Sequence, residues 1–410
     1  MFQDVSVFAM AVIFVALNGL TMLAWAAAQG YKMKPTAFAF FVGAVGNLVA
    51  GSVTPISGQS SILTVSHHIK NVNERMTALL IAVIVMVPMG LTGMVTRIAD
   101  WAGPAVVNGM MAGVGLMVAG IAFDMMKSER RTGWISFLSA LGSFVLFREL
   151  FPPGHSQNPH ILVYVIAVSI TLSSLDFVLL QKRRVDILQM AKDSGYTGDM
   201  EQNESPRFWT KEYWSDFKML KPKFGVNTIL FGLAFICLNI GTNIAFGNIT
   251  AGMGRDAYGN ILNPQNMDHL TVINSLADIP SIIFGGAPVG AIISATAAAP
   301  WPIIAGVVMM LLCGVLLLLG LMTRAIKYIP IASIAGFLFI IGFFSTFVPN
   351  LRNAIGVSAN PALRVAEISY TLDRAPEAIV AMGVTALTKN PFFGLMAGVG
   401  VRYIGGLFGL

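Results

Sequence analysis

Long apolar runs follow one another along almost the whole chain, and they constrain its fold more than any other feature. A helix that crosses a bilayer needs roughly 20 apolar residues. Spans are predicted near 5–28, 36–53, 76–96, 103–125, 133–149, 160–181, 225–246, 268–284, 303–322, 329–348, 376–390 and 392–409. Only 11% of the 410 residues are charged, whereas a soluble domain carries about 25%. The sequence therefore predicts an all-α polytopic membrane protein.

Two further apolar stretches hold too many glycines and prolines to form ordinary spanning helices. The first, at 51–68, reads GSVTPISGQSSILTVSHH, and the second, at 285–302, reads GGAPVGAIISATAAAPWP. Each stands third in its half of the chain. Interruptions in corresponding places of two halves point to a transporter's binding site near the middle of the membrane. We therefore predict fourteen segments, of which the third and the tenth are broken.

A polar stretch, 182–224, divides the chain into two parts of similar length. Residues 1–181 are predicted to form segments 1–7, and residues 225–410 segments 8–14. Because seven is odd, the second part crosses the membrane in the opposite direction to the first. The predicted fold is thus a 7+7 inverted repeat joined by a polar linker.

The two broken segments share a local pattern, in which a proline is followed by small residues and then by hydroxyl groups. The prolines are Pro55 in the first segment and Pro288 in the second. Non-helical backbone persists at membrane depth only where protein or a water-filled cavity satisfies its polar groups. We therefore expect the two segments to face each other inside the bundle, with the N-termini of the following helices directed at a polar solute between them.

Four stretches of the chain resemble the uracil/xanthine permeases, the nucleobase–cation symporter-2 family. They read TPISGQSS (54–61), GPAVVNGMMAGVGLMVAG (103–120), LNIGTNIAFGNITAG (238–252) and NSLADIPSIIFGGAPVGAIISATAAAP (274–300). The resemblance implies a core of segments 1–4 and 8–11 that moves against a gate of segments 5–7 and 12–14. It also implies a substrate between segments 3 and 10, with segments 1 and 8 beside it.

Uncharged polar side chains on these four core segments form the predicted site. The predicted substrate-binding residues are Asn18, Gln59, Ser60, Ser61, Thr242, Asn243, Gly290, Ser294 and Thr296. An amide offers both a donor and an acceptor to a planar heterocycle. In the alternative interpretation these side chains only hold neighbouring spans together. The glycines and methionines of 103–120 are predicted to serve helix packing or to face lipid.

The chain departs from the permeases at two positions where they carry carboxylates. Leu238 and Ser294 stand there instead, and neither can titrate. Asp278, within a predicted span, is the candidate for a coupling-ion ligand, because an ionisable group inside a membrane is costly and therefore often functional. Its alternative is a structural acid near the end of a segment. Asp124 and Asp176 are expected at the membrane interface.

Other chemistry finds little support in the sequence. His67 and His68 form a pair that titrates near neutral pH, but their place beside Lys70 favours an interfacial position. Cys237 and Cys313 lie in apolar runs without metal-ligand spacing and are interpreted as small buried hydrophobes. No nucleophile, metal set, phosphate loop or basic–aromatic stripe is apparent, so an enzyme, a cofactor and nucleic-acid binding are not expected.

The orientation in the membrane gives conflicting signals. Most of the 26 lysines and arginines fall on the side of the linker, and such residues accumulate in cytoplasmic loops. The resemblance implies the reverse, with both termini in the cytoplasm. The expected location is a bacterial-type cytoplasmic membrane, and a homodimer through the gate is a further expectation.

The sequence leaves three functions open. The first is a secondary transporter of a nucleobase or similar small planar polar solute that works by an elevator-like movement. It is either coupled to H⁺ or Na⁺, with proton coupling disfavoured by the two missing carboxylates, or a uniporter. The second is a carrier of a small anion, either a carboxylate or an inorganic ion, on the same fold. The third is a membrane receptor or scaffold that transports nothing.

Overall fold

The computed structural model describes residues 2–58, 71–152, 160–185, 217, 219, 221–225, 228–253, 265–355 and 375–408. Helices of the first part are α1 (Phe2–Ala27), α2 (Met33–Ala50), α4 (Val72–Leu91), α5 (Met94–Ala102), α6 (Pro104–Ser128), α7 (Arg130–Leu150), α8 (Ile161–Leu175) and the π-helix η2 (Asp176–Leu180). Those of the second are α11 (Thr228–Met253), α12 (Met267–Ile283), η3 (Ala295–Ala298), α13 (Pro302–Leu318), α14 (Met322–Ile326), η4 (Ile331–Ile334), α15 (Ala335–Phe339), η5 (Ile340–Phe347), α16 (Val348–Ala354), α18 (Ala375–Thr388) and α19 (Pro391–Phe408).

Eight of the described helical stretches are long and apolar enough to cross a membrane. They are Asp4–Ala24, Met33–Ala50, Val72–Leu91, Pro104–Ser128, Arg130–Leu150, Ile161–Leu180, Thr228–Met253 and Ile331–Ala354. The exposed large apolar side chains on most of them are leucine, valine and isoleucine, as expected for surfaces that face lipid. The chain is an all-α multi-pass membrane protein, which confirms the prediction at this level.

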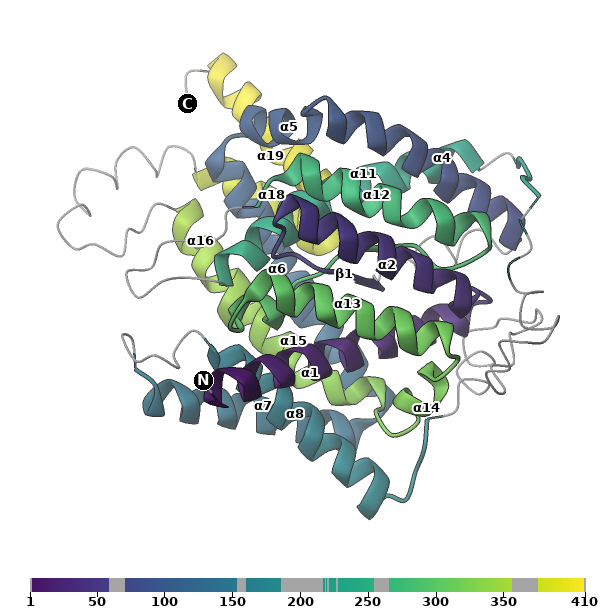
Figure 1. Ribbon diagram of the computed structural model, residues 1–410. Coiled ribbons are helices and arrows are strands. Elements are labelled where there is room, and N and C mark those ends of the chain that lie inside the picture. Colours follow the sequence, from purple (N-terminus) through teal and green to yellow (C-terminus); the bar gives the residue numbers. More distant parts are fainter. Residues whose placement is uncertain are drawn as a thin grey trace.

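The helices pack side by side in one bundle. Contacts made by a helix of the first part recur at the corresponding helix of the second part. For example, α2 packs on α13 as α12 packs on α4, and α7 packs on α8 as α18 packs on α19. Likewise α1 contacts α8, and α11 contacts α19. Helix α1 begins and α19 ends on the same side of the bundle, at the left of Figure 1.

Two short strands pair inside this bundle, and each belongs to one of the broken segments; we call this strand pair the crossing. Figure 1 labels the first strand, between α2 and α13 in that view. They are β1 (Ile56–Gly58) and β2 (Val289–Ala291), paired antiparallel, with Ile56 opposite Ala291, Ser57 opposite Gly290 and Gly58 opposite Val289. When the two segments are aligned on Pro55 and Pro288, Ser57 corresponds to Gly290, and these two residues pair with each other. Ile56 and Gly58 correspond to Val289 and Ala291, but each pairs with the counterpart of the other. A two-fold axis through the central pair produces this pattern. The expectation that the broken segments face each other is confirmed.

The ends of several spans differ from the predicted ones, and glycine explains two of the differences. The span expected at 76–96 ends at Leu91, because Gly93 adopts φ 71° and starts the separate helix α5. The span expected at 303–322 ends at Leu318, before Gly320 at φ 65°. Only glycine adopts this left-handed conformation without a steric penalty. By contrast, α11 continues past the expected end at residue 246, as far as Met253.

The glycine-rich run of α6 serves close packing, as the packing interpretation predicted. A Cβ atom on Gly109 would lie 2.3 Å from the carbonyl oxygen of Ala378, and one on Gly113 would lie 2.5 Å from that of Met382. The backbones of α6 and α18 therefore touch, which small residues permit in membrane bundles. Among the methionines of the run, Met110, Met111 and Met117 are buried, so they pack inside the protein and do not face lipid.

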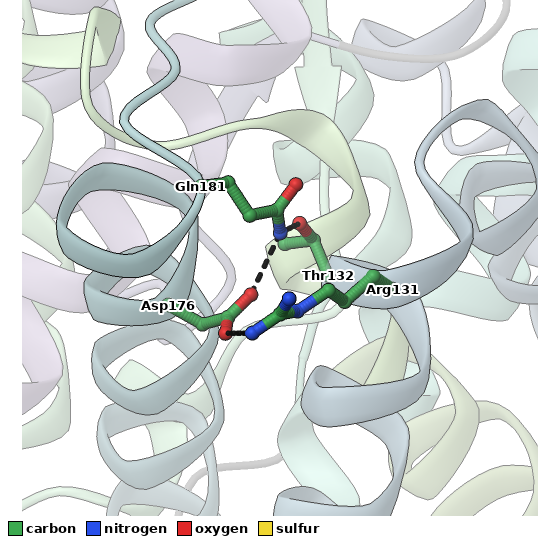
Figure 2. Close-up of polar contacts among 4 residues, drawn as sticks. All are labelled: Arg131, Thr132, Asp176 and Gln181. Atoms are coloured by element: carbon green, nitrogen blue, oxygen red, sulfur yellow. Dashed lines mark hydrogen bonds and ion pairs between the residues drawn. The ribbon is translucent and has the colours of Figure 1, made fainter.

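Asp176 lies near the end of the candidate span Ile161–Leu180, and its expected position at the membrane interface stays a prediction. Its side chain is 6% exposed and forms an ion pair of 2.7 Å with Arg131. Figure 2 shows that the other carboxylate oxygen accepts a hydrogen bond from Gln181 Nε2, which also donates to Thr132 Oγ1. The cluster joins the first turn of α7 to both ends of the π-helix, since Asp176 begins η2 and Gln181 follows it. Asp124, in contrast, is exposed beside Lys127.

Candidate functional site

The centre of the candidate site is the β1–β2 crossing, and side-chain hydrogen bonds fix the backbone that leads into β2. Both backbone groups of Ala287 are satisfied in this way. Its N–H donates to Thr36 Oγ1 at 2.8 Å, and its carbonyl accepts from Ser281 Oγ at 2.7 Å. Val289 N–H, the first of β2, donates to Asp278 Oδ1 at 2.6 Å. Each bond satisfies a buried backbone group that a helix would otherwise have paired internally.

Small residues let helices α1 and α2 approach strand β1 closely. A Cβ atom on Gly19 of α1 would lie 2.2 Å from Ser57 Oγ, and one on Gly43 of α2 would lie 2.1 Å from Ile56 Cδ1. Asn47 of α2 donates from Nδ2 to the carbonyl of Thr54 at 2.7 Å. The crossing is therefore enclosed by α1 and α2 on the side of β1.

The predicted residues of the tenth segment are buried and bind each other. Ser294 precedes η3, and its Oγ lies 2.7 Å from Thr296 Oγ1 and accepts from Thr296 N–H at 3.2 Å. Both side chains are at most 1% exposed. The helix that follows is the single 3-10 turn η3, which ends before Trp301 adopts φ 51° and Pro302 starts α13. Only this short turn separates β2 from α13, and whether the N-terminus of a following helix is directed at a solute here stays a prediction.

On the eighth segment, α11, the predicted polar residues also have partners within the protein. Asn243 accepts from Asn274 Nδ2 at 2.8 Å and donates to Thr271 Oγ1 at 3.0 Å, so its amide joins α11 to α12. Thr242 Oγ1 donates to the carbonyl of Asn239 at 3.1 Å. These bonds suit the alternative interpretation, in which polar side chains hold spans together. Whether they also bind substrate stays a prediction.

The structure places the other predicted residues as follows. Gly290 is at the centre of the ladder, opposite Ser57, and half-buried Asn18 lies on α1 beside Gly19, which touches β1. The remaining predictions lie outside the described residues, namely Gln59, Ser60, Ser61, His67 and His68. The structure therefore places predicted residues of the tenth segment at the crossing and Asn18 next to the contact of α1 with β1, whereas Thr242 and Asn243 have their described contacts within α11 and with α12.

Two residues that the sequence analysis missed also lie against the crossing. Ser57 is fully buried in β1, and its Oγ has no hydrogen-bond partner within the described chain. Thr250 of α11 donates from Oγ1 to the carbonyl of Ile292, just after β2, at 3.0 Å. Ser57 stands in the quoted TPISGQSS motif, so a site prediction that included every hydroxyl of the motif would have found it.

A third missed residue is a buried arginine at the start of α4. Arg75 is 2% exposed, donates from Nη2 to the carbonyl of Gln29 at 3.0 Å, and lies over the ring of Tyr31 at 4.4 Å. Its Nε has no hydrogen-bond partner in the described structure, and no carboxylate there pairs with it. A basic residue in the first turn of a predicted span is usually an interfacial anchor, so its position in the sequence did not distinguish it.

A cavity of about 480 Å³ lies between α6, α8, α11, η5 and α16. None of the predicted site residues lines it. Its lining comes from the first half of α6, the start of α8, the end of α11, and from η5 and α16; α16 lies at the left of Figure 1. A search of the described residues for three or more His, Cys, Asp or Glu side chains able to hold a metal ion finds no such group.

Comparison with known proteins gives structural neighbours only. No family model matches the sequence, and no curated protein does. The transmembrane domain of a cyanobacterium bicarbonate transporter, BicA, is similar with 13% identity and a TM-score of 0.47, over 97% of this chain and 98% of that one. SLC26A9 is similar with 12% identity and a TM-score of 0.49, over 100% of this chain and 66% of that one. At these values neither neighbour assigns a family or a substrate.

Proposed function

We propose that the protein is a secondary-active transporter that binds a small polar solute at the β1–β2 crossing. The observation that carries this proposal is the pairing of the two broken segments at the centre of the bundle, in a register that a two-fold axis generates. Broken segments that meet inside a membrane frame the binding sites of inverted-repeat transporters. The same register supports the 7+7 inverted repeat, with α5 and α14 as short connectors and not as spans.

We further propose that the core moves against the gate. The core comprises α1, α2, β1, α4, α11, α12, β2, η3 and α13; the gate comprises α6, α7, α8, η4 to α16, α18 and α19. The connector α5 is hydrogen-bonded to the core at its start and to the gate at its end. Asp268 of α12 accepts hydrogen bonds from the N–H groups of Val95 and Thr96 at its start, and Arg402 of α19 donates to the carbonyls of Trp101 and Ala102 at its end.

Two substrate classes are candidates at the crossing. A nucleobase or similar planar solute is supported by the motifs at 54–61, 238–252 and 274–300. A small anion is supported by the lack of a carboxylate at Leu238 and Ser294, since a carboxylate would repel it. The bicarbonate transporter that is similar in structure carries an anion, as its name says, and we include bicarbonate in the same test.

Uptake by purified protein in liposomes tests the proposal. The panel consists of labelled uracil, xanthine, bicarbonate and sulfate, each with and without a gradient of H⁺ or Na⁺. We expect saturable uptake of at least one solute above that of empty liposomes. If no solute of the panel enters and none stabilises the protein against heat, a receptor or scaffold becomes the better account.

A further inference from the structure

Basic side chains gather at one corner of the bundle, where the start of α7, the residues directly after η2 and the end of α14 meet. Described contacts join these three parts. The N–H of Val185 donates to the carbonyl of Lys327 at 2.8 Å, and the Arg184 guanidinium lies 5.8 Å from the ring centre of Tyr328. Figure 2 shows how α7 reaches η2 through an arginine. We call this group the basic corner, and its members are Arg130, Arg131, Lys182, Arg183, Arg184 and Lys327.

The basic corner carries more positive charge than its neighbouring acids neutralise. Asp176 pairs with Arg131 at 2.7 Å, and Glu129 pairs with Arg183 at 3.4 Å. Six basic residues less these two carboxylates leave an excess of four positive charges in the part of the chain that the structure describes. The corner therefore has positive charge to offer to an external anion.

Three of the cations carry this excess at the surface. Arg130, Lys182 and Arg184 are exposed, and none of them forms an ion pair with another described residue. Asp124, an exposed acid at the end of α6, does not compensate them, because it pairs with Lys127 at 2.8 Å and with Lys389 at 3.8 Å. The three side chains are thus free to bind a partner from outside the protein.

The backbone presents two of these cations against its own preference. Arg130 is the first residue of α7, whose first turn holds no acid, and the helix dipole disfavours a cation there. Lys182 adopts φ 52°, a left-handed conformation that is unfavourable for a residue with a Cβ atom. The turn is fixed by the N–H of Arg183, which donates to the carbonyl of Phe177 at 3.1 Å. Neither placement stabilises its own segment, whereas an anion at the corner is attracted by both.

Apolar side chains that face outward lie directly beside the corner. Trp134 and Leu138, one and two turns into α7, are 53% and 60% exposed, and Leu179 and Leu180 of η2 are 63% and 69% exposed. The candidate span Arg130–Leu150 begins at the corner and the candidate span Ile161–Leu180 ends there. The charges therefore lie level with one surface of the membrane, where tryptophan is also enriched.

This surface matches a partner that is anionic at one end and apolar at the other. A free anion leaves the exposed leucines and Trp134 uncovered, and a soluble protein does not reach side chains at the depth of the hydrocarbon. An anionic phospholipid covers both parts, because its phosphate lies at the membrane surface and its acyl chains lie below. Basic groups between helices at this level are typical of sites for anionic lipid headgroups.

We propose that the basic corner binds the phosphate headgroup of an anionic phospholipid, whose acyl chains lie along α7 and η2. Arg130, Lys182 and Arg184 contact the phosphate. Arg131 and Arg183 are held in place by their carboxylates and add to the positive potential. The bound lipid keeps the start of the polar linker at the membrane surface. This interaction goes beyond the transport proposal and does not depend on it.

Titration of the purified protein in detergent micelles with phosphatidylglycerol tests the inference, with the melting temperature as the measured response. Phosphatidylcholine and inorganic phosphate are titrated in parallel. In the triple variant Arg130→Gln, Lys182→Gln and Arg184→Gln, the apparent Kd for phosphatidylglycerol is expected to rise at least about tenfold, because each basic residue near an anionic lipid surface contributes severalfold. The matched control removes the same charge at three exposed residues elsewhere, as Arg97→Gln, Arg148→Gln and Arg352→Gln.

Loss of the response to phosphatidylglycerol in the corner variant, with the response kept in the control variant, supports the inference. Absence of a response in the wild type, or an equal loss in both variants, overturns it. Equal stabilisation by phosphatidylcholine shows a general effect of lipid, and equal stabilisation by inorganic phosphate shows a site for a free anion; either result overturns it. If the triple variant does not fold, Lys182→Gln alone decides: a rise in Kd of about threefold supports the inference, and an unchanged Kd overturns it.

Discussion

The crossing and the cavity are both polar places inside an apolar bundle, but they use their polar groups differently. At the crossing, the buried Asp278 accepts from the N–H of Val289, and the buried Ser294 accepts from the N–H of Thr296. In the cavity, half-buried Asn248 and exposed Asn353 make no side-chain hydrogen bond within the described chain. The first two side chains thus satisfy backbone groups of the broken segment, whereas the two amides satisfy no group of the described protein. The difference predicts that substitutions of Asp278 and Ser294 reduce stability, while a substitution of Asn248 changes it little.

The largest loss of stability is expected from a larger side chain at Gly19, where α1 contacts β1. Gly19→Leu places a side chain where Ser57 Oγ lies 2.2 Å from the new Cβ. Overpacking costs about 1–3 kcal/mol, and this one also displaces β1 from its partner. A fall in melting temperature, with loss of monodisperse protein on size-exclusion chromatography, is the expected result. Gly142→Leu on α7, where nothing lies within 4 Å of the new atom, serves as control and should melt like the wild type.

A slightly smaller loss is expected at Asp278. Asp278→Leu leaves the buried N–H of Val289 without its acceptor, which costs about 1–3 kcal/mol. Asp278→Asn keeps a carbonyl oxygen at that place and should melt within a few degrees of the wild type, with uptake retained. A coupling-ion ligand behaves otherwise: Asp278→Asn would then abolish gradient-driven uptake at unchanged stability. Melting curves and uptake under an imposed ion gradient distinguish these roles.

The smallest losses contrast one hydroxyl with one amide. Ser294→Ala removes the side chain that accepts from Thr296 N–H, and loss of such a cap costs about 1 kcal/mol. Asn248→Ala removes a side chain without a partner in the described structure and should change stability by less than about 0.5 kcal/mol. The contrast between crossing and cavity fails if the two variants melt alike or in the reverse order.

The helical architecture was predictable because hydropathy alone decides it. Backbone groups in lipid must bond within their own segment, so runs such as 103–125 leave little choice but a helix, and α6 follows at Pro104–Ser128. The facing of the two broken segments was predictable for the same reason. The connector α5 was missed because it is a short amphipathic helix that follows Gly93 directly after α4, and its polar residues looked like the end of a span.

The roles of individual polar residues were less predictable, because they depend on contacts between distant segments. Asn243 looks like a ligand in the sequence, yet it meets Asn274 and Thr271 of α12. The asparagines of the cavity went unnoticed for the opposite reason. Asn108 stands within a run interpreted as packing, and Asn350 stands at the end of a predicted span, while folding brings them to one cavity with Asn248.

The central claim, that the core moves against the gate, is tested most directly by a reversible cross-link between them. Cys237 and Cys313 are first replaced. The variant His160→Cys with Ala298→Cys then joins the residue before α8, in the gate, to η3, in the core. In the wild type the ring of His160 contacts the carbonyl oxygen of Ala298. Ser136→Cys with Ser169→Cys is the control within the gate, where the two hydroxyl oxygens lie 2.9 Å apart. We predict that oxidation of the first pair abolishes uptake, that reduction restores it, and that the second pair has no effect. Unchanged uptake with the first pair fully cross-linked would contradict the account.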